Sequence, residues 1–214
     1  MREEYAALVR DHPIPKQHVA TFLSTNALRG AGNCATSHDG AAHARRHRQQ
    51  RRWATQVIVT DELARQACTE RGLPPPDDVL PMRLLTVPET DIADLGSIIA
   101  AALAHSPAAR ALLADLEREQ HVPETAVRDY YDRNQDRFLT PDALRRGVDP
   151  FNTVEPSDVH PYEHVEDGIS QQLRHAAAHR AFFDWLDQAR ADVVYAEGYE
   201  HPGDPSQPDH EHRH

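Results

Sequence analysis

The sequence predicts a mainly α-helical protein, a helical array with a small two-stranded β element that the N- and C-terminal segments form together. Alanine, the strongest helix former, is the commonest residue of the chain. From Val165 to Leu186, apolar residues recur at steps of three, four or seven, which is the spacing of one helix face. Two short apolar or β-branched segments, Tyr5–Val9 and Asp192–Ala196, lie near the two ends and are suited to pairing.

The first half of the chain predicts that the first strand is followed by two helices. Apolar residues spaced along one face predict a helix that begins at Lys16 and ends before a loop over residues 30–40. A long helix is expected over residues 41–71, with Gly72 at its end. Residues 73–90 are interrupted by prolines and predict a connector to the next helix.

The second half predicts a series of shorter helices and then one long helix. A helix is expected from Asp91 to about His105. Three dipeptides that end in proline, which we call proline pairs, then predict new helix starts. A proline in the first turn of a helix gives up no hydrogen-bond donor that the helix needs. These pairs are Ser106-Pro107, Val122-Pro123 and Thr140-Pro141. After a loop over residues 147–160, a helix of about 28 residues is expected behind Pro161.

Composition and charge narrow the classes of function. The net charge of −11 argues against general nucleic-acid binding. No apolar run reaches the ~20 residues that a membrane span needs, so no membrane partner is expected. The start MREEYAALVRDH lacks the basic and apolar regions of a signal peptide, so we expect a cytoplasmic protein. Cys34 and Cys68 form no CxxC pair and are expected to be buried thiols.

Two segments of the second half carry a family resemblance. VPETAVRDYYDRNQDRF fits a Val-x-x-Tyr-Tyr-x-x-Asn-x-x-x-Phe pattern, and HPYEHVEDGISQQL fits a Pro-aromatic-Glu-x-Val-x-x-x-Ile-x-x-x-Leu pattern. Through them, residues 5–196 resemble the chaperone domain of the SurA, PrsA and NifM group of parvulin-type peptidyl-prolyl isomerases. The matching residues are Val127, Tyr130, Tyr131, Asn134 and Phe138, then Pro161, Tyr162, Glu163, Val165, Ile169 and Leu173.

In that group a catalytic domain stands between the two patterns, whereas this chain has only residues 139–160 there. A segment of this length cannot build a pocket that stabilises a twisted prolyl amide. The resemblance therefore implies no catalytic residue in this chain. It implies a folding factor that binds unfolded or nascent client polypeptide without isomerase catalysis, through an apolar groove or a sheet edge. The candidate client-binding residues are Tyr130, Tyr131, Phe182 and Trp185, for which ordinary core packing is the alternative.

Residues 1–197 are expected to form the helical domain, and residues 198–214 a flexible, histidine-rich tail. Fifteen of the residues are histidine. In an extended tail, alternate imidazoles share one side and can converge on Zn²⁺ or Ni²⁺. The tail candidates are His201, His210, His212 and His214, and a weaker cluster is Cys34, His38, His43 and His47. A solvated tail and scattered surface histidines are the alternatives.

Two further patterns involve histidine. His175 and His179 lie one helical turn apart beside the apolar face of the late helix, where packing or partial burial is the simpler interpretation. Residues 160–164 have the letters of an HxxEH metalloprotease motif, but Pro161 places His160 at a helix cap. The alternative to a folding factor rests on the tail histidines. It is a metal-binding accessory or maturation protein for a metalloenzyme, which would bind the metal through that tail.

Overall fold

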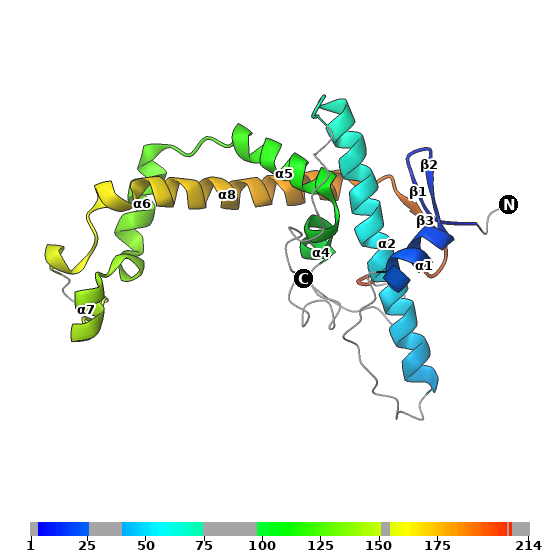
Figure 1. Ribbon diagram of the computed structural model, residues 1–214, viewed down its shortest axis with the longest axis horizontal. Helices are drawn as coiled ribbons and strands as arrows, with labels where there is room; N and C mark the ends of the chain where they lie inside the picture. The colour runs from blue at the N-terminus through cyan, green and yellow to red at the C-terminus, as the bar shows by residue number, and fades with distance from the viewer. Residues whose placement is uncertain (1–3, 26–39, 75–97, 151–154, 205, 207–214) are drawn as a thin grey trace. The chain divides into compact units, whose positions relative to one another are not determined.

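The computed structural model describes residues 4–25, 40–74, 98–150, 155–204 and 206. Within these ranges the protein is mainly helical, with a small antiparallel sheet (Figure 1). The chain divides into two compact units: residues 1–112 with 184–214, called the first unit, and residues 113–183, called the second unit. None of the described helices combines the length and the apolarity needed to span a bilayer.

The sheet of the first unit has three strands in the order β2-β1-β3. The pairing predicted for the chain ends is confirmed, because β1 (Tyr5–Val9) runs antiparallel to β3 (Val194–Tyr195). The two-stranded prediction was incomplete, since β2 (His12–Pro15) pairs with the other side of β1. Two prolines conceal β2 in the sequence, and an edge strand tolerates them because one of its sides needs no donor.

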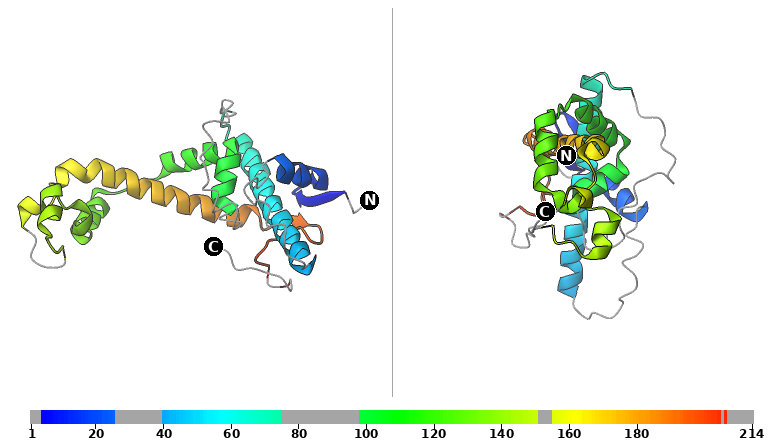
Figure 2. Two further views of the ribbon diagram at one scale, coloured as in Figure 1. Left: turned by 60° about the horizontal axis from the view of Figure 1, so that its bottom comes forward. Right: turned by 90° about the vertical axis from the view of Figure 1, so that its left-hand side faces the viewer.

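Two helices pack beside the sheet in the first unit, and both were predicted. They are α1 (Lys16–Thr25) and α2 (Gly40–Glu70), and α1 packs at an angle against α2 (Figure 2). Gly72, with a φ of 63°, ends α2 in the left-handed conformation expected of such a glycine. The predicted loop at 30–40 lies outside the described residues except for Gly40, and so does the connector from residue 75 onward.

The core of the first unit joins apolar side chains of the sheet, α1, α2 and α4 (Ile98–His105). All ten side chains from Arg52 to Asp61 are buried, so the middle of α2 is enclosed on every side. Its fully buried members include Val57, while Phe22 of α1 packs against Trp53 with 6.2 Å between the ring centroids. The start of the helix expected from Asp91 lies outside the described residues, and its end at His105 agrees.

The predicted helix starts are confirmed at two of the three proline pairs. Before α5 (Pro107–Glu119), the Ser106 hydroxyl accepts a hydrogen bond from the Ala109 amide at 2.9 Å. Before α7 (Pro141–Arg146), Thr140 accepts from the Ala143 amide in the same way. At the third pair the helix α6 (Glu124–Arg133) begins one residue later than predicted. Pro123 is the cap residue before the helix, with an extended backbone, and not the first helical residue.

The second unit also contains the short 3-10 helices η2 (Gln135–Phe138) and η3 (Pro156–Asp158). The long late helix is confirmed as α8 (Tyr162–Ala189), which has 28 residues. The loop predicted over 147–160 is closed at its base, where Leu139 and Val159 form an isolated antiparallel bridge.

Candidate functional site

The two segments that carry the family resemblance meet in one aromatic cluster of the second unit. The Tyr131 ring lies 5.2 Å from that of Phe138 and 5.6 Å from that of Tyr162, centroid to centroid. Val127 and Ile169 are buried in the same cluster. The Tyr131 hydroxyl donates to the His160 carbonyl at 2.7 Å. Residues far apart in the sequence are thus joined into one core by aromatic packing.

The segment between these two patterns is drawn together by main-chain hydrogen bonds. The His160 amide donates to the Phe138 carbonyl at 2.8 Å, and the Thr140 amide donates to the Asp158 carbonyl at 2.7 Å. The buried Asp158 carboxylate pairs with Arg146. The ends of residues 139–160 therefore lie side by side, and the described part of this segment holds α7, η3 and turns.

The candidate client-binding residues differ in exposure, and two of them prove to be core residues. Tyr131 is 8% exposed and Phe182 is 1% exposed, so these side chains do not line an accessible groove. Tyr130 and Trp185 are partly exposed. The core alternative therefore describes Tyr131 and Phe182, because aromatic side chains at helical spacing mostly fill the interior.

Among the described residues, three large apolar side chains are exposed: Leu144 at 62%, Val194 at 55% and Phe183 at 45%. None of them was a candidate client-binding residue, although Phe183 lies in the apolar pattern of the late helix and Val194 in the last predicted strand. Val194 differs from the others in its position, because it belongs to β3, a strand at an edge of the sheet.

The two edges of the sheet differ in their main-chain donors. Pro13 pairs opposite Leu8, and Ile14 pairs opposite Ala7. Because proline has no N–H and main-chain groups alternate in direction along a strand, Pro13 and Pro15 occupy the positions that face away from β1. The outer edge of β2 therefore offers no N–H at these positions to an added strand.

The β3 edge retains its donor and its acceptor. The Ala196 amide donates to the Ala6 carbonyl at 2.9 Å, and Ala7 is the partner of Tyr195. By the same alternation, the N–H and C=O of Tyr195 are directed away from β1. Among the described residues, no strand pairs with this outer side.

The side chain of Tyr195 anchors β3 to the middle of α2. Its hydroxyl donates to the Gln56 side-chain oxygen at 3.1 Å. Burial raises the pKa of Tyr195, while the Gln56 hydrogen bond and Arg190 lower it. The strand is thus held on one side by β1 and below by α2, which leaves its outer side as the edge described above.

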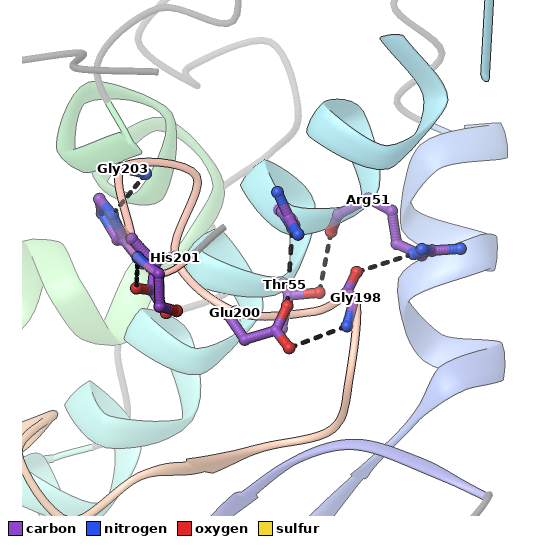
Figure 3. A network of polar contacts seen from close by, with 9 residues as sticks. Arg51, Thr55, Gly198, Glu200, His201 and Gly203 are labelled. Carbon is purple, nitrogen blue, oxygen red and sulfur yellow. Dashed lines mark hydrogen bonds and ion pairs between the residues drawn. The ribbon is translucent and has the colours of Figure 1, made fainter. Parts of the chain in front are cut away.

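Beyond β3 the chain contacts α2 through Gly198 and Glu200, although a flexible tail was expected from residue 198. Arg51 donates through Nε to the Gly198 carbonyl at 3.0 Å, and the Gly198 amide donates to Glu200 at 2.9 Å (Figure 3). Nε of the buried Arg52 side chain lies 3.6 Å from Oε2 of Glu200. Gly198 has a φ of 79°, and a Cβ there would meet an Arg51 nitrogen at 2.8 Å. These contacts depend on particular side chains of α2, so the composition of residues 198–214 alone did not predict them.

The network also includes the first of the metal candidates. His201 accepts a hydrogen bond at Nδ1 from the Gly203 amide at 3.1 Å (Figure 3). Burial lowers the pKa of His201, and Arg190 lowers it further, whereas Asp204 and Asp187 raise it. One of its two nitrogens is therefore already committed to the local turn.

The other metal candidates are only partly described. His210, His212 and His214 lie outside the described residues, as do Cys34 and His38. His43 lies in α2 without a described side chain, and His47 is exposed. The described residues contain no group of three or more histidine, cysteine or acidic side chains that could hold a metal ion. Metal binding by the tail remains a prediction. The predicted burial of Cys68 is confirmed.

Two remaining features of the described residues offer little chemistry. An open cavity of about 480 Å³ lies between the β1–β2 turn and α2. Its charged side chains are largely paired, as in Arg10 with Glu70, so no set of groups converges on a ligand. In the HxxEH segment, His160 precedes α8 and His164 lies on it, so the two imidazoles do not occupy successive turns of one helix.

Comparison with protein-family models, with curated proteins and with solved structures finds no match for this chain.

Proposed function

We propose that this protein is a SurA-like folding factor that binds non-native polypeptide without prolyl isomerisation, and that it receives an extended client segment at the outer edge of β3. One observation carries the proposal. The sheet has one edge blocked at two positions by proline and one edge with an exposed valine and an outward-facing N–H and C=O pair.

Strand addition suits a protein that must bind many sequences. Main-chain hydrogen bonds are common to all extended polypeptides, and an exposed apolar side chain adds contact to the apolar residues of an unfolded client. The β3 edge supplies both, through Tyr195 and Val194. Each main-chain bond contributes about 1 kcal/mol net, so two such bonds support weak and rapidly reversible binding.

The absence of isomerisation is argued from the length of residues 139–160. The isomerase relatives place a whole domain at this point, and here the chain returns to its starting place through the Leu139–Val159 bridge. A polypeptide holder needs no such domain, because holding requires an exposed binding surface and no stabilised transition state.

The test is suppression of aggregation, followed by light scattering. Insulin is reduced so that its B chain aggregates, and stoichiometric full-length protein is added. We expect suppression by the natural protein. Val194→Lys should raise the concentration needed for half suppression several-fold, because a charge replaces the apolar contact on the edge. Leu144→Lys is the matched control, since Leu144 is equally exposed but belongs to the second unit.

The outcomes separate the function from its site. No suppression by the natural protein would contradict client holding. Suppression that is lost with Leu144→Lys and kept with Val194→Lys would retain client holding and move it to the second unit. A short extended peptide that competes with the client adds a check on the main-chain bonds. Two versions are made, one N-methylated at the odd amide nitrogens and one at the even ones. Only one version should lose its competition, because only one side of the peptide backbone pairs with the edge.

A further inference from the structure

The second unit holds a pair of neighbouring histidines that the proposed function does not use. His175 and His179 lie one turn apart on α8, and their ring centroids are 4.3 Å apart. The His175 side chain is 56% exposed, and that of His179 is partly exposed. Both rings are thus open to solvent and close enough for their nitrogens to reach one small ion.

A carboxylate from a neighbouring helix faces the same pair. Oε2 of Glu117, on α5, lies 3.6 Å from Nδ1 of His175. Glu117 and both histidines belong to the second unit. A carboxylate beside one ring nitrogen favours the tautomer that carries its proton there, and this leaves the other nitrogen of His175 with a lone pair.

Neutral imidazole is the metal-binding form, and burial favours that form at His179. Burial lowers the pKa of His179, the neighbouring His175 lowers it further, and Glu117 raises it. Two rings in contact also resist double protonation, because like charges at this distance repel.

We propose that His175 and His179 together bind one borderline divalent transition-metal ion such as Zn²⁺, with Glu117 as the carboxylate that orients His175. Imidazole pairs suit Zn²⁺, Ni²⁺ and Cu²⁺, and water completes the coordination. With two protein ligands the binding is much weaker than in a closed four-ligand site. This site shares no residue with the β3 edge or with the tail candidates, and it does not depend on client binding.

The experiment uses the full-length chain with His210, His212 and His214 changed to glutamine, so that the tail does not compete for metal. Zn²⁺ alone is the probe, and uptake is measured by isothermal titration calorimetry. We expect His175→Gln and His179→Gln each to remove the same single equivalent of Zn²⁺. Glu117→Gln should keep the equivalent and weaken it by about 10-fold, as expected for loss of a supporting carboxylate. His121→Gln, at an exposed histidine of the same unit, should change nothing.

Nuclear magnetic resonance of the imidazole C–H groups gives a second readout that does not require the variants to fold. Zn²⁺ should shift the signals of His175 and His179 together at one midpoint. Unchanged Zn²⁺ uptake in both histidine variants would overturn the proposal. So would imidazole signals of this pair that stay in place while Zn²⁺ binds elsewhere.

Discussion

Two glycines of the second unit occupy opposite kinds of backbone position. Gly147 ends α7 with a φ of 69°, and its amide donates to the Leu144 carbonyl at 3.1 Å. Gly168 lies inside α8 and is exposed. A Cβ added at either position would meet no atom within 4 Å, so the two sites differ in backbone conformation and not in available space.

The same substitution should therefore have opposite effects at these positions. Gly147→Ala should lower the free energy of unfolding by about 1 kcal/mol, because a side chain is strained in the left-handed region. Gly168→Ala should raise it by about 0.5–1 kcal/mol, because alanine loses less conformational entropy in a helix. Urea denaturation followed by far-ultraviolet circular dichroism measures both. Two shifts of the same sign would contradict the assignment of these backbone conformations.

At the scale of elements, the second unit depends on how α6 is joined to the start of α8. The Tyr131 hydroxyl on α6 donates to the carbonyl of His160, just before α8, at 2.7 Å. Arg128 lies over the ring of Tyr162, 3.7 Å from its centroid. Tyr130, the neighbour of Tyr131, is on a more exposed face, where its hydroxyl lies 3.3 Å from Gln172.

Tyr131→Phe should lower the free energy of unfolding by about 1 kcal/mol, because the largely buried hydroxyl is removed and the His160 carbonyl loses its donor. Tyr130→Phe is the matched control and should change stability by at most a few tenths of a kcal/mol, since water can replace an exposed hydrogen bond. Denaturation followed by circular dichroism compares the two. Equal losses would show that the Tyr131–His160 bond does not join these elements.

The middle of α2 shows how a helix can be enclosed while keeping polar residues. Thr55 and Thr60 donate their hydroxyls to the carbonyls of Arg51 and Gln56, four residues earlier, at 2.8 Å each. Each of these two hydroxyls is thereby satisfied within the helix, so burying the threonines leaves neither hydroxyl without an acceptor. The pattern of apolar residues alone predicted a helix with one buried face, and the polar residues hid the enclosure.

At the scale of the whole molecule, both units contain histidines whose surroundings disfavour the charged form. His105 and His201 belong to the first unit and His179 to the second. Burial lowers the pKa of His105, with Asp61 opposing and with His18, Arg65 and Arg110 acting in the same direction. The His105 ring also packs edge-on against Phe22, with 4.7 Å between the centroids.

The sign of the pH dependence follows from these lowered pKa values. Between the folded pKa and the ordinary value of 6.5, the unfolded chain binds more protons than the folded one. The stabilisation is therefore complete above about pH 7 and is lost as the pH falls toward the folded pKa. We expect the first unit to unfold at a lower urea concentration at pH 5.5 than at pH 7.5.

Tryptophan fluorescence measures this effect in the first unit, because Trp53 and Trp185, the two tryptophans of the chain, both belong to it. His201→Gln should reduce the difference between the two pH values. His12→Gln, at an exposed position of β2, is the control and should leave the difference unchanged. A first unit that becomes more stable at pH 5.5 would contradict the assignment.

Much of the fold follows from local patterns in the sequence. The serine and threonine caps before α5 and α7 and the extent of α8 follow from residues close together in the chain. The pairing of β1 with β3 was predicted from two local strand patterns, although the strands lie at opposite ends of the chain. Such signals are local because a cap or a helix face depends on neighbours three or four residues away. Their physical meaning does not change when distant parts of the chain pack around them.

The exposure of each side chain could not be predicted in this way. Tyr131 and Phe182 have the residue types of a binding groove and lie in the interior, whereas Val194, predicted only as part of a strand, is exposed on a sheet edge. Residues 198–204 have the composition of a solvated tail, yet the Gly198 carbonyl accepts a hydrogen bond from Arg51 on α2. Local sequence thus specified most of the helices and the strands at the chain ends, but burial depends on contacts between separate elements, which only the packing of the folded chain creates.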